Sequence, residues 1–182
     1  MKRRIGALLL CLILALSFAG CADDEAVSTY TVTRAYINQE YVDTGSEERG
    51  IVVLLTSSVD LDCTEDEKYG AVIESLREEY MPPDAGKLKL KTAVGDSVRF
   101  NDIYREDSTV YVDFKGENLN GGSLQESMLI TQIVETLTDS FSEVKDVRLL
   151  IDGEEAETLM GHIDISQPFV EGVLGGGAQE AE

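Results

Sequence analysis

The chain has 182 residues and a formal net charge of −20, from 15 Lys and Arg against 35 Asp and Glu. This acidity argues against nucleic-acid binding, which needs a basic surface, and against electrostatic docking on anionic lipid. The stretch of about 140 residues between Thr29 and Phe169 suffices for one ordinary hydrophobic core. A single domain is therefore expected.

Residues 1–20 have the pattern of a secretory signal. Three basic residues precede an apolar run from Ile5 to Phe18, and small residues follow before Cys21. The run is shorter than the roughly 20 apolar residues that cross a bilayer. Without residues 1–20, 12 basic and 35 acidic residues remain, a formal charge of −23.

The junction Ala19-Gly20-Cys21 resembles the lipobox of bacterial lipoproteins, although Phe18 stands where leucine is usual. The resemblance implies acylation of the Cys21 thiol and an extracytoplasmic protein, lipid-anchored to the outer face of the cell membrane. Two acyl chains hold a globular domain stably at such a surface. Residues 21–28 then form a lipidated tether. Ordinary secretion, with Cys21 unmodified, is the alternative.

No disulfide is expected. Cys11 leaves with the signal and Cys21 is acylated, so Cys63 has no intramolecular partner. The acidic residues around Cys63 should raise the pKa of its thiol, which favours a passive side chain over a reactive one. They are Asp60, Asp62, Glu65 and Asp66.

Two strands and a helix are predicted in the first half of the domain. Residues 29–37 alternate as a half-buried strand does, and residues 51–55 are continuously apolar, as in a central strand covered on both faces. Residues 64–67 have the form of a capping box and should start a helix, which Pro82 and Pro83 end. Its apolar stripe comprises Tyr69, Val72, Ile73, Leu76 and Tyr80.

A hairpin and a second helix follow. Residues 87–94 are a modest extended candidate, and residues 98–104 and 109–114 flank a polar turn as the arms of a hairpin. After Gly121 and Gly122, residues 123–126 form a second capping box that starts a helix. The stripe of this helix is Leu129, Ile130, Ile133, Val134 and Leu137.

The last predicted strand covers residues 147–151, and Asp152-Gly153 is a favoured hairpin turn that returns into an edge arm at residues 154–159. Residues 170–182 are expected to be a flexible acidic tail. The element order αββαβ, preceded by one or two strands, predicts an α+β fold in a single domain over residues 29–169. It would have a mainly antiparallel sheet with two helices packed on one face.

These residues resemble those of a known family, the GerMN-domain, GerM-like lipoproteins of sporulation and spore germination. The matching segments are Gly122-Ser123-x-x-Glu126, Gln132-Ile133-Val134-x-Thr136-Leu137-Thr138, residues 147–153, and Leu159-x-Gly161-His162-x-Asp164-x-Ser166-x-Pro168. Val112-Asp113 after the hairpin fits as well. The likeness runs from about Thr29 to Phe169 and is specific in its second half.

The resemblance implies a non-enzymatic module related to the ring-building domains of sporulation and secretion assemblies. We therefore expect a scaffold or assembly factor that acts in sporulation or germination and binds extracytoplasmic protein partners. A homo-oligomer is left open, but the charge of −23 favours a more basic hetero-partner. The alternative from another class is a cell-envelope sensor that binds a sugar, peptide or wall fragment.

No catalytic, cofactor or metal site is expected. His162 is the one histidine, so a base or metal ligand beside Asp152 and Asp164 would lack a second imidazole. Ser123 near Glu126 is better explained by helix capping than by nucleophilic catalysis. Residues 60–71 resemble a calcium loop only faintly, because the sixth position is Glu65 instead of glycine.

Overall fold

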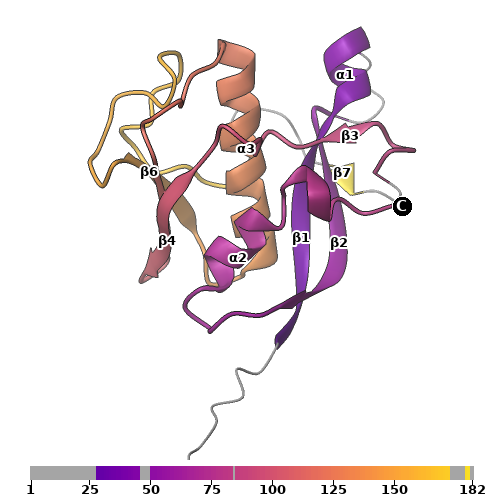
Figure 1. The fold of residues 1–182 in the computed structure, drawn as a ribbon, viewed down its shortest axis with the longest axis horizontal. Coiled ribbons are helices and arrows are strands. Elements are labelled where there is room, and N and C mark those ends of the chain that lie inside the picture. Colours follow the sequence, from indigo (N-terminus) through magenta and orange to yellow (C-terminus); the bar gives the residue numbers. More distant parts are fainter. Residues whose placement is uncertain (1–27, 46–49, 84, 173–178, 181–182) are drawn as a thin grey trace, which may run out of the picture.

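The computed structural model describes residues 28–45, 50–83, 85–172 and 179–180, and Figure 1 shows its fold. These residues form a four-stranded sheet of order β3-β1-β2-β7 and a three-stranded sheet of order β4-β5-β6. The predicted α+β class and the single domain are confirmed. The prediction of one common sheet is wrong, because helix α3 stands between the two sheets and keeps their strands apart (Figure 1).

In the first sheet, β1 (Ser28–Asn38) pairs with β2 (Val52–Leu61) in antiparallel orientation. Strand β3 (Leu90–Lys91) joins the end of β1, so the extended segment predicted at 87–94 is reduced to two residues. Strand β2 runs beyond the predicted 51–55, and its first three residues are fully buried while the following residues alternate. Only the start of β2 is therefore covered on both faces.

A short helix, α1 (Gln39–Thr44), follows β1 and was not predicted. The Asn38 side chain accepts hydrogen bonds from the backbone N–H groups of Glu40 and Tyr41, which caps the first turn. Gly45, at φ 68°, ends the helix in the left-handed conformation.

The first predicted amphipathic helix is present but shorter than expected. Helix α2 (Lys68–Glu74) ends well before the prolines, and a 3₁₀ turn, η2 (Glu78–Tyr80), follows. The Glu67 carboxylate accepts from the N–H of Thr64, as a capping box requires, but the Thr64 hydroxyl also donates to Glu67 instead of accepting from the backbone. Tyr80 is 56% exposed, so its assignment to the buried stripe was wrong.

The αββαβ order is confirmed by α2, β4 (Phe100–Glu106), β5 (Thr109–Phe114), α3 (Ser123–Ser140) and β6 (Asp146–Ile151). Strands β4 and β5 form the predicted hairpin, whose turn places Asp107 at φ 53°. Strand β6 runs parallel to β5, because the crossover through α3 returns the chain in the same direction. The apolar stripe of α3 is fully buried, as predicted.

The segment after β6 differs from its prediction. Asp152 and Gly153 adopt positive φ angles of 51° and 80°, which makes the predicted tight turn. The expected edge arm at 154–159 does not form, since only Glu154 bridges back, to Ile151. Within the expected flexible tail at 170–182, Gln179–Glu180 forms β7, parallel to β2. Residues 173–178 and 181–182 lie outside the described residues.

The secretory signal at 1–20, the acylation site Cys21 and the tether up to residue 27 also lie outside the described part of the chain. Among the helices that are described, none is long and apolar enough to span a membrane.

Candidate functional site

Helix α3 covers the outer edge of β1 with polar side chains. The Thr136 hydroxyl accepts from the N–H of Ala35 at 3.0 Å, and the Gln132 amide donates to the carbonyl of Ala35 at 2.8 Å. One turn further on, the Ser140 hydroxyl accepts from the N–H of Thr33 and donates to its carbonyl. A strand edge that would otherwise be open for pairing is thereby sealed from within the domain.

The Glu126 carboxylate lies fully buried and fixes the loop that follows β6. One oxygen accepts from the N–H groups of Leu159 and Met160, and the other from the N–H of His162 at 2.9 Å. The Nδ1 atom of His162 lies 3.1 Å from the same carboxylate. The prediction that Glu126 closes a capping box with Ser123 is therefore wrong. The N-cap is Gly122 instead of Ser123, and the side-chain oxygen of Gln125 accepts from the N–H of Gly122.

The residues considered as a catalytic base or metal ligand, His162, Asp152 and Asp164, each bind a different group. His162 faces Glu126, whereas Asp152 accepts from Asn101 and Gly116, and Asp164 accepts from the N–H of Ser166. Each of these side chains therefore has a structural partner of its own.

Cys63 is partly buried, and its thiol pKa is raised by burial first and by the carboxylates of Glu67, Asp62 and Glu65 next. A raised pKa leaves little thiolate at neutral pH, in agreement with a passive role. Within the part of the chain that the structure describes, no group of three or more His, Cys, Asp or Glu residues is placed to hold a metal ion.

A buried lysine links the start of α2 to the segment after α3. The Lys68 ammonium forms ion pairs with Glu65 and, at 2.8 Å, with Glu143. Burial by itself would lower the pKa of Lys68, but the hydrogen bonds to Glu143 and Glu65 outweigh burial and raise it. The hydrogen bond from Lys68 in turn holds the pKa of Glu143 below its usual value.

The second half of β2 has an open outer edge. The Asn38 N–H donates to the Ile51 carbonyl, and this bond fixes which backbone groups of β2 face β1. By alternation along the ladder, the N–H and C=O groups of Ser58 and Asp60 point away from β1. Strand β7 pairs only with Val53 and Leu54, and no other described strand continues along this edge.

A groove of about 540 Å³ lies beside this edge. One wall is the end of β2, and the other is formed by α2 and η2. The lining residues are Arg34, Ser58, Val59, Asp60, Leu61, Asp62, Ala71, Glu74, Ser75 and Tyr80. The groove thus combines apolar walls, an open strand edge and three carboxylates.

Arg34, at the base of this groove, is only 6% exposed. Its guanidinium donates to the carbonyls of Ser75 and Tyr80 and to the hydroxyl of Ser57. These bonds place a cation at the carbonyl end of α2, where the helix dipole favours a positive charge. The Nε–H of Arg34 is buried and has no hydrogen-bond partner among the described residues.

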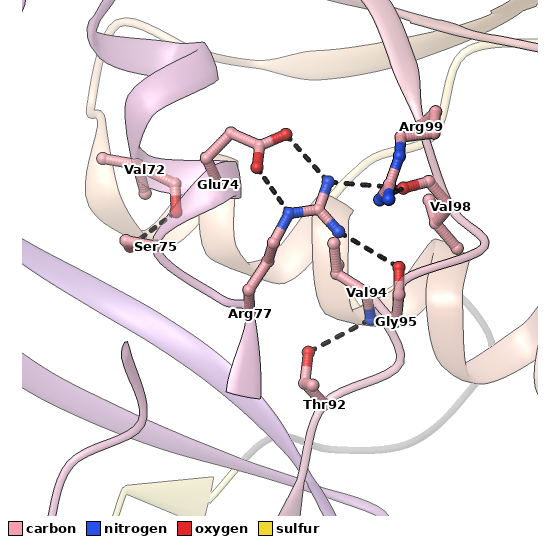
Figure 2. A network of polar contacts seen from close by, with 9 residues as sticks. All are labelled: Val72, Glu74, Ser75, Arg77, Thr92, Val94, Gly95, Val98 and Arg99. Atoms are coloured by element: carbon pink, nitrogen blue, oxygen red, sulfur yellow. Dashed lines mark hydrogen bonds and ion pairs between the residues drawn. The ribbon is translucent and has the colours of Figure 1, made fainter. Parts of the chain in front are cut away.

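Arg77 holds the loop between β3 and β4 against the end of α2, as Figure 2 shows. Its guanidinium binds both oxygens of Glu74, at 2.5 and 3.0 Å, and donates to the carbonyls of Gly95 and Val98. A second groove, of about 560 Å³, lies against this loop and is lined mainly by charged residues. A third, of about 340 Å³, shares Asp62, Ala71 and Glu74 with the groove beside β2.

Two of these features, the polar line of α3 and the buried Arg34, could have been recognised from the sequence, although the prediction did not use them. Gln132, Thr136 and Ser140 are polar residues spaced by four, which places them on one line of the helix. Arg34 is a cation inside the apolar half of a predicted strand. The open edge of β2 has no such signal, because strand pairing joins segments that are far apart in the sequence.

Comparison with known proteins gives a family and a fold. A family model described as "Germane: Sporulation and spore germination" matches residues 33–157. No curated protein matches the chain.

Two solved structures from Bacillus subtilis are similar. The first GerMN domain of the sporulation protein GerM has a TM-score of 0.55 at 20% identity, covering 78% of this chain and 98% of that one. The tandem GerMN domains of GerM give a TM-score of 0.54 at 20% identity, covering 79% of this chain and 46% of that one. These two structures share its fold, and the match over residues 33–157 places the chain in the Germane family of sporulation and spore germination.

Proposed function

We propose that this protein is a non-enzymatic, extracytoplasmic scaffold or assembly factor of sporulation or spore germination, anchored to the cell membrane by lipid on Cys21. The observation that carries the proposal is the use of the polar residues in the domain. Glu126, His162, Gln132 and Thr136 are of the residue types that catalytic sites use, and all four are engaged in holding the fold. The groove beside β2 remains as a surface for another molecule.

The anchor follows from the secretory signal and the lipobox-like residues before Cys21. Cys21→Ala should move the protein from the membrane fraction to the soluble extracytoplasmic fraction. Cys63→Ala is the matched control and should leave the protein in the membrane fraction. Equal membrane retention of the Cys21→Ala variant would contradict lipid anchoring.

Protein partners can be recovered by affinity capture of the full chain from detergent-solubilised membranes of sporulating cells, after reversible cross-linking. The proposal expects specific extracytoplasmic proteins in the eluate, enriched over a capture with an unrelated lipoprotein. A clean monomer under these conditions would count against the scaffold role.

A second candidate is a cell-envelope sensor, favoured by the volume of the groove beside β2 and its partly apolar lining. Thermal-shift measurements with sugars, peptides and wall fragments separate the two functions. A ligand present at 100 times its dissociation constant adds about 2.7 kcal/mol to the free energy of unfolding. A sugar or wall fragment that produces such a shift would favour the sensor.

A further inference from the structure

We infer that the open edge of β2 binds an extended, basic segment of a partner protein, which adds to the sheet as a further strand. The inference rests on the proposed scaffold function and names the surface and the chemistry of the partner. Three features of the described residues carry it: the free backbone groups, the groove beside them and the charge around both.

The backbone groups come first. Ser58 and Asp60 direct their N–H and C=O groups outward, and β1 occupies the opposite edge of β2 through Ser57 and Val59. An extended chain laid along this edge can form the same ladder that β1 forms on the other side. The equivalent groups of β1, at Thr33 and Ala35, are already bonded to α3. Among the described residues, the first sheet is therefore sealed along β1 and open along the second half of β2.

The groove decides where the side chains of the added strand go. Val59 and Leu61 point to the same face of the sheet as Arg34. Arg34 lies opposite Leu55, and side chains an even number of residues apart on a strand share a face. Alternate residues of the added strand on this face enter the groove, against Val59, Ala71 and Tyr80. Apolar residues fit these positions, because Val59, Ala71 and Tyr80 line this part of the groove.

The charge of the nearby side chains determines which residues suit the face of the added strand that points away from the groove. Asp60 points to the opposite side of the sheet, where its carboxylate accepts from Thr29, and Asp62 follows at the end of the groove. Of the basic side chains near the groove, Arg34 is buried against carbonyl groups and Arg77 is bound to Glu74. The carboxylates of Asp60 and Asp62 have no basic partner in the described part of the domain and therefore favour lysine or arginine at the alternate positions of the added strand. The partner segment should alternate apolar and basic residues.

The test uses the full chain and a synthetic peptide of alternating valine and lysine, with binding measured by calorimetry. Two control peptides accompany it: one with glutamate in place of lysine, and one with alternate backbone nitrogens methylated so that they cannot donate. The inference expects each control peptide to bind at least about tenfold more weakly, because like charges and lost ladder bonds both oppose docking. Equal binding of the methylated peptide would overturn strand addition.

Two variants locate the binding at β2. Ser58→Pro removes an outward N–H and leaves the bonds of Ser57 and Val59 to β1, and Asp60→Lys reverses the charge at the edge. Glu117→Lys makes the same charge change at an exposed site away from the groove. The inference expects about tenfold weaker binding for the two β2 variants and little change for Glu117→Lys. Equal losses for Asp60→Lys and Glu117→Lys would show nonspecific attraction to an acidic chain and overturn it.

The same variants separate this inference from the scaffold function. If affinity capture recovers the same partners with the wild-type chain and with Ser58→Pro and Asp60→Lys, the edge of β2 is not the docking surface and the scaffold role stands. If capture recovers no partner and the peptide does not bind, both fail. Should Ser58→Pro not fold, the methylated peptide and Asp60→Lys still decide the question.

Discussion

At the scale of single residues, the Glu126 carboxylate is the most demanding group in the domain. It is fully buried and accepts three backbone N–H groups from the loop after β6, in addition to its contact with His162. Burial of a charged group is tolerated only when hydrogen bonds replace its water. The buried position of Glu126 therefore depends on this loop, and the loop conformation depends on Glu126.

Replacing the Glu126 carboxylate by an amide should lower the free energy of unfolding, although the two groups have nearly the same shape. Glu126→Gln puts an N–H₂ donor against backbone donors, and we expect a loss of about 2–3 kcal/mol in the free energy of unfolding. Denaturant unfolding measures it, with the exposed Glu117→Gln as the control, which should change little. A Glu126→Gln protein as stable as the wild type would show that the loop is held by other contacts.

Thr136 supplies the second test at this scale. Thr136→Val keeps the shape of the side chain but leaves the buried N–H of Ala35 without its acceptor, and we expect a loss of about 1–3 kcal/mol. Thr138→Val removes only a bond from a hydroxyl to the carbonyl of Val134 in the same helix, so it should cost less. If both substitutions cost the same, the bond between Ala35 and Thr136 contributes no more than a bond within the helix.

At the scale of elements, the structure joins α2 to the segment after α3 through Lys68 and Glu143. Because Lys68 holds the pKa of Glu143 below the usual glutamate value of 4.5, the ionised pair stabilises the folded chain above that pH. This contribution is lost as the pH falls through the lowered pKa of Glu143.

Lys68→Met removes the cause of the lowered pKa. The free energy of unfolding should therefore fall less steeply for the variant than for the wild type when the pH drops from about 7 to about 3. Lys145→Met, which removes an exposed lysine nearby, should keep the steepness of the wild type. Parallel curves for the wild type and Lys68→Met would contradict the role of this pair.

The sequence predicted the elements better than their ends and their pairing. The stripe of α3 and the alternation of β5 identify these elements because each pattern is local. The end of α2 was predicted too late, and the carbonyl of Ser75 just after it binds Arg34, which comes 41 residues earlier in the chain, a contact that no local pattern reveals. The split into two sheets could not be predicted either, because it follows from hydrogen bonds between α3 and β1 across about 100 residues.

At the scale of the whole molecule, the residues that carry the family resemblance are structural. Glu126, Gln132 and Thr136 position a loop and seal a strand, and none of the three lines the groove beside β2. The resemblance therefore reports the fold directly and the docking surface only indirectly. The residues that set the shared fold are thus different from the residues proposed to select the partner of this chain.

Amide hydrogen exchange of the full chain without partners compares the two edges of the first sheet most directly. The N–H groups of Thr33 and Ala35 are bonded to α3, whereas those of Ser58 and Asp60 face outward from β2. Slow exchange at Thr33 and Ala35 with fast exchange at Ser58 and Asp60 is the expected result. Exchange at Ser58 and Asp60 as slow as at Ala35 would mean that the edge of β2 is already occupied, and would contradict the account.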